Sequence, residues 1–251
     1  MERYEHEVLH AVNLRGTVSV RDLAALLDVS DQTIRRIVRP MVARGDVGKV
    51  HGAVTSLSGA RVVGDPPFLS RMNVQREAKV KIAAAVAGLI HDGDTVALDT
   101  GSTTSFIAQA LRGHHGLTVV TNSSFIATTL ATIPGNRVHM AGVELRNHDG
   151  AAFDEAAFRV VRSMKVRVAV LSASAIDGAR GPMVHEHAEA EMSATMAAIA
   201  DRRILAADSS KFDRGAVFAL TGFGLGDTLV TDRAPSAGLR RAVRPLTVKV
   251  A

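Results

Sequence analysis

The stretch from Leu98 to Leu111 reads LDTGSTTSFIAQAL and marks a change from one kind of secondary structure to another. The apolar run DTVAL, which ends at Leu98, has the composition of a strand, and FIAQAL has that of a helix. Between them lies a cluster of small hydroxylated residues around Gly101. A helix N-terminus attracts anions, because its first N–H groups are unpaired and carry a partial positive charge. The stretch therefore predicts a strand, a loop suited to an anion, and a helix.

The same alternation continues from about Phe68 to the C-terminus. Strand-like runs that alternate with helix-like runs predict an α/β domain with a mostly parallel sheet. The expected strands are 95–98, 118–121, 137–141, 166–172, 203–206 and 228–231, and the expected helices are 78–90, 103–111, 125–131, 154–164, 189–200 and 236–242.

Three of the predicted strand ends carry residues that suit an anionic ligand. In sheets of this kind, ligands bind beyond the carboxyl ends of the strands, where the strand order reverses. The three loops are Asp99–Thr104, Thr121–Ser124 and Asp208–Lys211. Each loop by itself has an alternative explanation, because Ser and Thr after a strand are commonly helix caps. Three such loops at one edge favour a phosphorylated small molecule, and the lack of a following Gly-Lys-Ser/Thr argues against a nucleoside triphosphate.

The first 56 residues have a different pattern, with three short helices and a β-hairpin. Ser19 and Ser30 are placed to cap the second and third helices, and Gly45 is placed to end the third. Two helices joined by a short turn predict a helix-turn-helix, here followed by a wing at 47–54. We expect a winged helix-turn-helix domain at 1–56, a linker at 57–67 that contains two consecutive prolines, and the α/β domain at 68–251.

The third helix is the candidate DNA reader. Its start presents short polar side chains suited to base edges, and arginines suited to phosphates. A solvated helical face is the plainer explanation of such a charge run, but the helix-turn-helix-hairpin order favours DNA. The predicted DNA-binding residues are Ser30, Gln32, Thr33, Arg35, Arg36, Arg39, Lys49 and His51.

The composition of the 251 residues sets further limits. Without cysteine there is no disulfide, thiolate metal site or cysteine nucleophile. Aromatic residues make up 4%, too few for the stacking platforms of a single-strand binder. The longest aliphatic run, 82–90, is far shorter than the roughly 20 residues that cross a bilayer, and the N-terminus does not look like a signal peptide. We expect a cytoplasmic protein with no membrane partner, whose net charge of +5 permits a polyanionic one.

Two histidines invite a metal hypothesis, which we reject. His185 and His187 would point to different sides of a helix. The chain has no helical pair of histidines with a flanking glutamate, and it has no thiols. We therefore expect neither a metal nor a cofactor, and we interpret this segment as a polar loop and helix start near the pocket.

Over essentially its full length the chain resembles the DeoR-type regulators of bacterial sugar operons. The matching motifs include VSDQTIRR at 29–36, LDTGSTT at 98–104, VVTNS at 119–123 and ADSSKF at 207–212. The resemblance implies a winged helix-turn-helix joined to a sensor domain similar to ribose-5-phosphate isomerase, which binds a phosphorylated sugar or polyol. The effector-binding residues so predicted are Asp99, Thr100, Gly101, Ser102, Thr103, Thr104, Thr121, Asn122, Ser123, Gly142 and Lys211.

Two departures from the family pattern bear on these expectations. Pro40 lies inside the third helix, where a proline costs about 3 kcal/mol, so we expect a kink or an early end near Arg36–Pro40. The segment that carries acidic residues in similar isomerases reads SASAID here and leaves only Asp177, while Asp99 and Glu144 also lie near the predicted pocket. A pocket with few carboxylates favours sensing over catalysis.

We therefore interpret the chain as a ligand-responsive repressor of a carbohydrate catabolic operon, and not as an enzyme. A homodimer or larger assembly is expected, because DNA half-sites mirror protein symmetry. Two alternatives stay open: a sugar-phosphate isomerase-like enzyme with an appended helical domain, and an interaction module that does not bind DNA.

Overall fold

The computed structural model describes the chain except for residues 1, 16, 45, 51, 57–67 and 147–148. Contacts between residues divide the chain into two compact units, Met1–Ser70 and Arg71–Ala251, each with its own hydrophobic core. The predicted linker at 57–67, the predicted helix end at Gly45 and the predicted DNA contact His51 lie outside the described residues.

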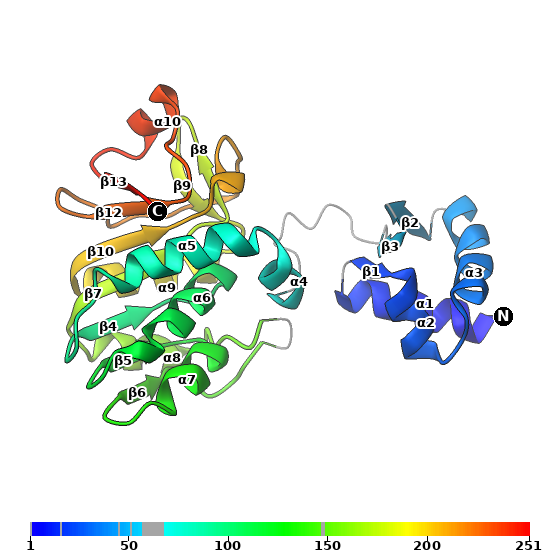
Figure 1. Ribbon diagram of the computed structural model, residues 1–251, viewed down its shortest axis with the longest axis horizontal. Helices are drawn as coiled ribbons and strands as arrows, with labels where there is room; N and C mark the ends of the chain where they lie inside the picture. The colour runs from blue at the N-terminus through cyan, green and yellow to red at the C-terminus, as the bar shows by residue number, and fades with distance from the viewer. Residues whose placement is uncertain (1, 16, 45, 51, 57–67, 147–148) are drawn as a thin grey trace. The chain divides into compact units, whose positions relative to one another are not determined.

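Up to Ser56, the described residues of the N-terminal unit form three helices and a small antiparallel sheet (Figure 1). The sheet has the order β1-β3-β2, and β2 and β3 form the predicted hairpin. A winged helix-turn-helix is therefore confirmed for this part of the chain. Its elements are α1 (Glu2–Arg15), β1 (Thr17–Ser19), α2 (Val20–Leu27), α3 (Asp31–Arg44), β2 (Val47–Val50) and β3 (Ala53–Ser56).

Two serines define the starts of α2 and α3. The Ser19 hydroxyl accepts a hydrogen bond from the Asp22 backbone N–H at 3.0 Å, and the Ser30 hydroxyl accepts one from the Thr33 N–H at 3.2 Å. Each bond satisfies one N–H group that the first turn of a helix leaves unpaired. Between the two helices, Asp28 adopts the left-handed conformation with φ of 51°, which turns the chain. Local sequence thus determines the turn of this motif.

Helix α3 continues through Pro40 to Arg44, so the expected early end is wrong. Pro40 has no N–H to donate to the Arg36 carbonyl, which weakens the helix at this point. Ile37 and Met41, on either side of the proline, are both buried in the core of the unit. Burial of large apolar side chains contributes about 1.5–3 kcal/mol each, enough to offset the lost hydrogen bond.

The C-terminal unit is built on a seven-stranded sheet in which every pairing is parallel. The predicted α/β class is confirmed, and the predicted strands all occur in it. An additional strand, β13, pairs with β12 at one edge. In spatial order the strands are β13 (Thr247–Val250), β12 (Thr228–Thr231), β10 (Ala200–Ala206), β7 (Val166–Ser172), β4 (Thr95–Leu98), β5 (Thr118–Thr121) and β6 (Arg137–Met140).

Helices cover both faces of this sheet (Figure 1). Successive residues of β4 point to opposite faces, as the period of a strand requires. Val96 and Leu98 pack in the core with helices α5–α7, and Ala97 packs in the core with α8 and α9. The helices of this unit are α4 (Phe68–Asn73, at the junction of the two units), α5 (Arg76–Ala87), α6 (Ser102–Ala110), α7 (Ser124–Ala131), α8 (Glu155–Arg162), α9 (His187–Ala198) and α10 (Ala237–Ala242), with 3-10 turns η1 (Leu111–Gly113) and η2 (Ser209–Lys211).

A second, small antiparallel sheet follows β7 and was not predicted. It has the order β11-β9-β8 and joins β8 (Ala175–Asp177), β9 (Gly181–Val184) and β11 (Phe218–Ala219). The segment SASAID thus ends one parallel strand and begins a strand of another sheet. Among the described residues, no helix is long and apolar enough to cross a bilayer.

Candidate functional site

The order of the strands places a switch point between β4 and β7. From β4 the chain proceeds to β5 and β6 on one side, and from β7 it proceeds to β10, β12 and β13 on the other. The loops that follow β4 and β7 therefore diverge, and parallel sheets generally bind ligands at such a switch point. Asp99 begins the first loop and Ser172 ends β7, so both lie at this point.

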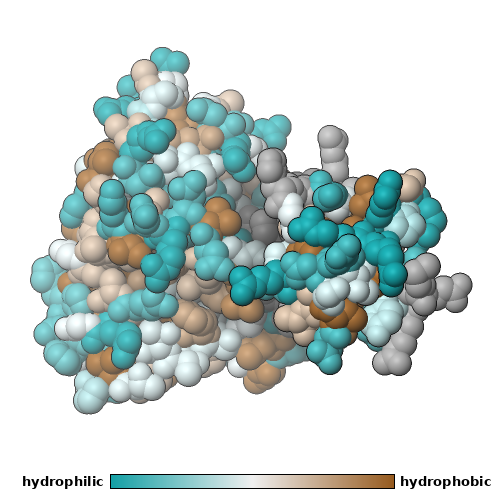
Figure 2. Space-filling model, turned by 45° about the vertical axis from the view of Figure 1, so that its right-hand side comes forward, coloured by the Kyte–Doolittle hydropathy of each residue, from teal (hydrophilic) through white to brown (hydrophobic). Residues whose placement is uncertain are grey.

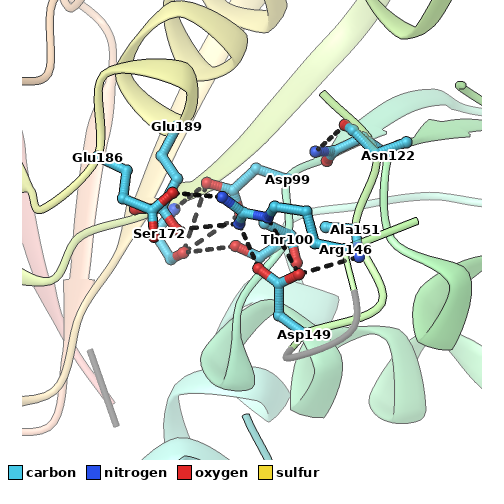
Figure 3. Close-up of polar contacts among 10 residues, drawn as sticks. Asp99, Thr100, Asn122, Arg146, Asp149, Ala151, Ser172, Glu186 and Glu189 are labelled. Carbon is cyan, nitrogen blue, oxygen red and sulfur yellow. Dashed lines mark hydrogen bonds and ion pairs between the residues drawn. The ribbon is translucent and has the colours of Figure 1, made fainter. Parts of the chain in front are cut away.

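Asp99 is held by Ser172 from the neighbouring strand (Figure 3). The Ser172 backbone N–H donates to Asp99 Oδ2 at 2.8 Å, and the Ser172 hydroxyl lies 3.3 Å from Asp99 Oδ1. Burial raises the pKa of Asp99 to about 8, an effect that the hydrogen bonds from Ser172 oppose and the charge of Glu189 reinforces. At neutral pH the carboxyl group is therefore mostly protonated, and it does not repel an anion bound beside it.

Gly101 allows the loop to approach β7 closely. A Cβ atom at this position would lie 2.6 Å from the Ser172 hydroxyl oxygen and 3.2 Å from Thr104 Oγ1. The Gly101 carbonyl accepts three hydrogen bonds, from the Ser105 N–H at 2.9 Å, the Ser105 hydroxyl at 2.7 Å and the Thr104 hydroxyl at 3.0 Å. Thr104 thus helps to shape the loop. Because its hydroxyl already donates to the Gly101 carbonyl, it is less available to bind an effector than Ser102 and Thr103 are.

The start of α6 leaves donors available beside this loop. In the described part of the chain, the backbone N–H groups of Ser102 and Thr103 and their hydroxyls have no hydrogen-bond partner. Both residues are buried, at 7% and 6% exposure. The Thr100 hydroxyl is also buried without a partner among those residues. This set of oriented donors at a helix N-terminus is the chemistry that binds phosphate.

The loop after β5 contributes one side chain of the same kind. Thr121 accepts a hydrogen bond from the Ser123 N–H at 3.1 Å, and Ser123 caps α7 through Ile126, so both act structurally. Asn122 is fully buried and donates its amide NH₂ to the Ala152 carbonyl at 3.0 Å. Its amide oxygen has no partner in the described residues. Of the three predicted residues, Asn122 has the group that is still available to a ligand.

Gly142, after β6, has a structural reason to be glycine. Its φ is +101°, and a Cβ atom there would lie 2.2 Å from the Cβ of Ala152. The backbone N–H groups of Val143 and Glu144 both donate to Asp154 at 2.9 Å, which holds the pKa of Asp154 below its usual value. Glu144 itself is exposed. The structure therefore assigns Gly142 to the turn, and its predicted contact with an effector stays a prediction.

Lys211 lies in η2, after β10, at the same edge of the sheet. Strand β7 separates β10 from β4, so this loop and the loop that contains Gly101 lie on opposite sides of β7. The Lys211 side chain is partly exposed and makes no hydrogen bond or ion pair within the described ranges. Asp208 caps the turn by accepting from the Ser210 N–H at 3.0 Å. Lys211 thus has an available positive charge at this edge.

Sequence reasoning missed a group of charged residues close to Asp99 (Figure 3). The guanidinium of Arg146 pairs with Asp149, Glu186 and Glu189, and it lies 3.9 Å from the centre of the Phe153 ring. Arg146 and Asp149 come from the loop before α8, and Glu186 and Glu189 come from the start of α9. Glu186 and Glu189 lie about 40 residues from Arg146 along the chain, so no local motif reveals that they pair. We call these four charged residues the Arg146 cluster.

Two other polar groups near this edge have structural roles. Asp177 accepts hydrogen bonds from the Ala179 and Arg180 N–H groups at 2.8 Å, which lower its pKa, so it closes a turn. His187 packs edge-on against Phe218, with ring centres 5.3 Å apart. No group of three or more His, Asp or Glu residues suited to a metal ion occurs among the described residues.

In the N-terminal unit, α3 presents the predicted DNA-reading face. Arg35, Arg36 and Arg39 are exposed and, in the described residues, have no ion pair, whereas Arg44 pairs with Glu5 and Asp46. Figure 2 turns this unit forward and shows many hydrophilic side chains on its visible face. One surface hollow is lined by Ser30, Gln32, Thr33, Arg35, Arg36 and Arg39, which the sequence predicted together.

Not every residue of the predicted DNA-binding set is equally available. The Ser30 hydroxyl is used by the cap and lies 2.9 Å from the Thr33 hydroxyl. Gln32 is exposed, and Lys49 is exposed on β2 of the wing. The arginines and Gln32 are therefore the side chains best placed to contact DNA.

A helix-turn-helix whose third helix presents exposed arginines in one unit, and buried hydrogen-bond donors at a helix start in the other, are the features expected of a regulator with separate domains for DNA and for a small ligand. Comparison with known proteins agrees. Residues 5–60 match the DeoR-like helix-turn-helix domain, and residues 74–233 match the DeoR C terminal sensor domain. The chain therefore belongs to the DeoR family, which confirms the resemblance, and its relatives are named as repressors rather than enzymes.

Two relatives cover nearly the whole chain. The HTH-type transcriptional repressor CsqR of Escherichia coli K12 is 31% identical over 97% of this chain and 92% of its own length. The glycerol-3-phosphate regulon repressor of the same strain is 29% identical over 94% of this chain and 92% of its own. Among solved structures, ribose 5-phosphate isomerase A from Neisseria gonorrhoeae aligns with 56% of this chain and 55% of its own, at 17% identity and a TM-score of 0.41. A likeness at that level carries no argument about activity.

Proposed function

We propose that the protein represses a carbohydrate catabolic operon and that a phosphorylated sugar or polyol is its effector. One observation carries the proposal: unpartnered donors at the start of α6 lie at the switch point of the sheet, beside a mostly protonated Asp99. The name of the glycerol-3-phosphate regulon repressor, a relative over 94% of this chain, includes a phosphorylated polyol. A compound of this class supplies the anion that such donors bind.

In this proposal the effector's phosphate lies against the loop after β4. The N–H groups and hydroxyls of Ser102 and Thr103, with the Thr100 hydroxyl, donate to its oxygens. Lys211 supplies a positive charge from the other side of β7, and Asn122 accepts from a hydroxyl of the sugar. Charged hydrogen bonds contribute about 1.5–3 kcal/mol each, so Lys211 would contribute much of the affinity.

The DNA-binding part of the proposal depends on α3. Gln32 and Thr33 would contact base edges, and Arg35, Arg36 and Arg39 would contact phosphates. Ser30 would orient the start of the helix, and Lys49 and His51 would contact DNA from the wing. A homodimer or larger assembly in the cytoplasm would bind two half-sites.

Effector binding would change DNA affinity by linkage. If the effector binds one conformation of the assembly more tightly, it shifts the population towards that conformation and alters operator affinity. A switch from 1:99 to 99:1 needs roughly a 10⁴-fold difference in effector affinity between the two states.

The test uses the full-length protein and a DNA duplex that it selects from a random pool. DNA affinity is measured with and without candidate sugar and polyol phosphates, and turnover of the same compounds is assayed. The proposal predicts tight, salt-dependent DNA binding that one of these compounds weakens without being converted. It fails if the protein does not bind DNA, or if no phosphorylated compound that binds the protein alters DNA affinity.

A further inference from the structure

We infer that the C-terminal unit has a DNA-binding surface of its own, which contacts the phosphate backbone of duplex DNA through arginines at the end of α10. This surface is separate from α3 and from the effector site, so the inference goes beyond the proposed function. Contacts to phosphates add affinity that depends on salt and carries no base specificity.

The excess positive charge of the protein is concentrated in its last residues. The chain has 30 Lys and Arg residues and 25 Asp and Glu residues, which gives a formal net charge of +5. Residues 233–251 contain five of the basic residues and no acidic residue, so 25 basic and 25 acidic residues are left in 1–232. The net charge of the whole chain therefore equals the charge of this C-terminal basic segment. Its basic residues are Arg233, Arg240, Arg241, Arg244 and Lys249.

The fold brings three of these arginines together at the end of α10. Leu239 and Val243 are buried, at 1% and 2% exposure, and they pack the helix into a core cluster of the unit. Backbone hydrogen bonds from Val243 to Leu239 and from Arg244 to Arg241 continue the turn past the helix end. Helical spacing therefore places Arg240, Arg241 and Arg244 in one sector of the helix surface, outside the buried stripe. All three are exposed, and we call them the arginine group.

The charges of the arginine group are available to a partner. None of the three guanidinium groups forms an ion pair with a described residue. Arg240 Nε donates one hydrogen bond, to the Pro235 carbonyl at 3.2 Å. Within the described ranges, the side chains of Arg241 and Arg244 make no hydrogen bond. Three positive charges thus remain at the surface without a carboxylate partner in the described chain.

The turn between β8 and β9 lies against the end of α10 and does not offset these charges (Figure 1). A Cβ atom at Gly181 would lie 3.0 Å from the Ala242 carbonyl oxygen. The turn carries one acidic and one basic residue, Asp177 and Arg180. The Ala179 and Arg180 N–H groups, and the charge of Arg180, lower the pKa of Asp177. One charge of each sign leaves the arginine group in excess.

The chemistry of the segment fits the backbone of duplex DNA. Guanidinium groups bind phosphate oxygens in pairs. Four residues of a helix span about 6 Å, and the phosphates of one strand are about 3.4 Å apart along the duplex axis, so the group can reach several phosphates. Residues 233–251 include no aromatic residue on which the bases of single-stranded RNA could stack. Val250 is the exposed large apolar residue of the segment, which provides no apolar centre for a protein partner.

Single residues of the segment also have plainer explanations. Arg240 and Arg241 lie in the last turn of α10, where basic side chains interact favourably with the helix dipole. Lys249 lies on the edge strand β13, where a charge discourages pairing with another chain. Neither role needs a partner, and neither explains why the segment has no acidic residue. Both predict that DNA binding does not depend on these side chains.

The experiment compares variants of the full-length protein on a DNA duplex of unrelated sequence. The arginine-group variant combines Arg240→Gln, Arg241→Gln and Arg244→Gln. A matched control removes the same charge from three exposed positions on separate parts of the unit, by Lys81→Gln, Arg112→Gln and Lys165→Gln. Fluorescence anisotropy measures the affinities between about 50 and 200 mM salt. Circular dichroism and thermal unfolding establish that the variants are folded.

We expect the arginine-group variant to bind this duplex at least about tenfold more weakly than wild type, because each phosphate contact adds to the affinity. The slope of log affinity against log salt should fall by about two to three units. The control should change the affinity less than about twofold, since its charges lie away from the surface. Lysine at the same three positions keeps the charge and should restore most of the affinity.

Each other outcome contradicts the inference. Equal losses in the arginine-group variant and the control would mean that only net charge matters. Wild-type affinity in the arginine-group variant, or no recovery with lysine, would also overturn it. If the variant loses affinity for single-stranded RNA but not for duplex DNA, the partner is RNA and the inference is wrong.

The proposed role of α3 is tested separately. Arg35→Ala and Arg36→Ala are combined, and binding to a selected operator is compared with that of the arginine-group variant. If the α3 variant binds operator as wild type does while the arginine-group variant binds it more weakly, the proposed DNA reader fails and the surface at α10 stands. If only the α3 variant loses affinity, for operator and for unrelated DNA, the surface at α10 fails and the proposed function stands.

Discussion

The Ser172 backbone N–H donates to Asp99 Oδ2 at 2.8 Å and so joins the carboxyl ends of β7 and β4 across the switch point of the sheet. The bond holds a buried carboxyl group beside the loop that we propose binds phosphate. Several testable properties of the protein depend on this arrangement.

Asp99→Asn should change how stability depends on pH. Because burial raises the pKa of Asp99 to about 8, the folded protein holds a proton between about pH 4 and pH 8 that the unfolded chain releases. The free energy of unfolding therefore falls as pH rises through this range, by at most about 1.4 kcal/mol per pH unit from this group. Asparagine has no proton to lose, so the variant should gain stability relative to wild type as pH rises from 5.5 to 8.5. Urea unfolding measures the free energy of unfolding of both proteins at each pH. If this free energy depends on pH in the same way for the two proteins, Asp99 is already ionised in the folded state.

Gly101→Ala should disturb the cradle by steric contact. The added Cβ would lie 2.6 Å from the Ser172 hydroxyl oxygen, which must then rotate away from Asp99. We expect a loss of stability of about 1–2 kcal/mol and weaker effector binding. Gly113→Ala is the matched control, because no atom lies within 4 Å of a Cβ added there. Equal effects of the two substitutions on effector binding would count against the close approach at Gly101.

Arg35→Ala and Arg36→Ala should weaken DNA binding and reduce its dependence on salt. Each phosphate contact that is lost lowers the slope of log affinity against log salt by roughly one unit. Arg112→Ala, which removes an exposed arginine from the other unit, is the control for net charge. Affinities measured from 50 to 200 mM salt give the slopes. Wild-type slopes and affinities in both variants would exclude α3 as the DNA reader.

Pro40→Ala should stabilise the N-terminal unit. Helix α3 already continues through this position, so alanine restores an N–H that can donate to the Arg36 carbonyl. We expect the restored hydrogen bond to raise the free energy of unfolding by roughly 1–3 kcal/mol. Part of this gain is lost because alanine gives the unfolded chain more conformational freedom than proline does. Thermal unfolding followed by circular dichroism measures the change. A lower melting temperature would mean that the native helix needs the proline.

Several features of the fold could be predicted from local patterns. The strand, loop and helix around Gly101 follow from a short apolar run and a cluster of hydroxyl groups, and both serine caps of the helix-turn-helix follow from adjacent residues. The length of α3 could not be predicted in the same way. Burial of Ile37 and Met41 by other elements overcomes the local effect of Pro40.

Other features depend on contacts between distant segments. Strand β9 contains Gly181 and Pro182, residues that are rare in strands, and it forms because β8 and β11 pair with it. The Arg146 cluster unites segments about 40 residues apart, and no spacing rule connects them. The sequence likewise cannot show that Thr121 and Ser123 are used in local hydrogen bonds while the Asn122 amide oxygen remains without a partner.

Operator binding by wild type and Lys211→Ala, each titrated with effector, tests the central claim most directly. The account predicts that effector weakens operator binding by wild type, and that Lys211→Ala binds operator as tightly as wild type when effector is absent. It also predicts that the variant needs roughly ten- to a hundredfold more effector for the same response. A folded Lys211→Ala protein that responds to effector as wild type does, or that no longer binds operator, would contradict the account.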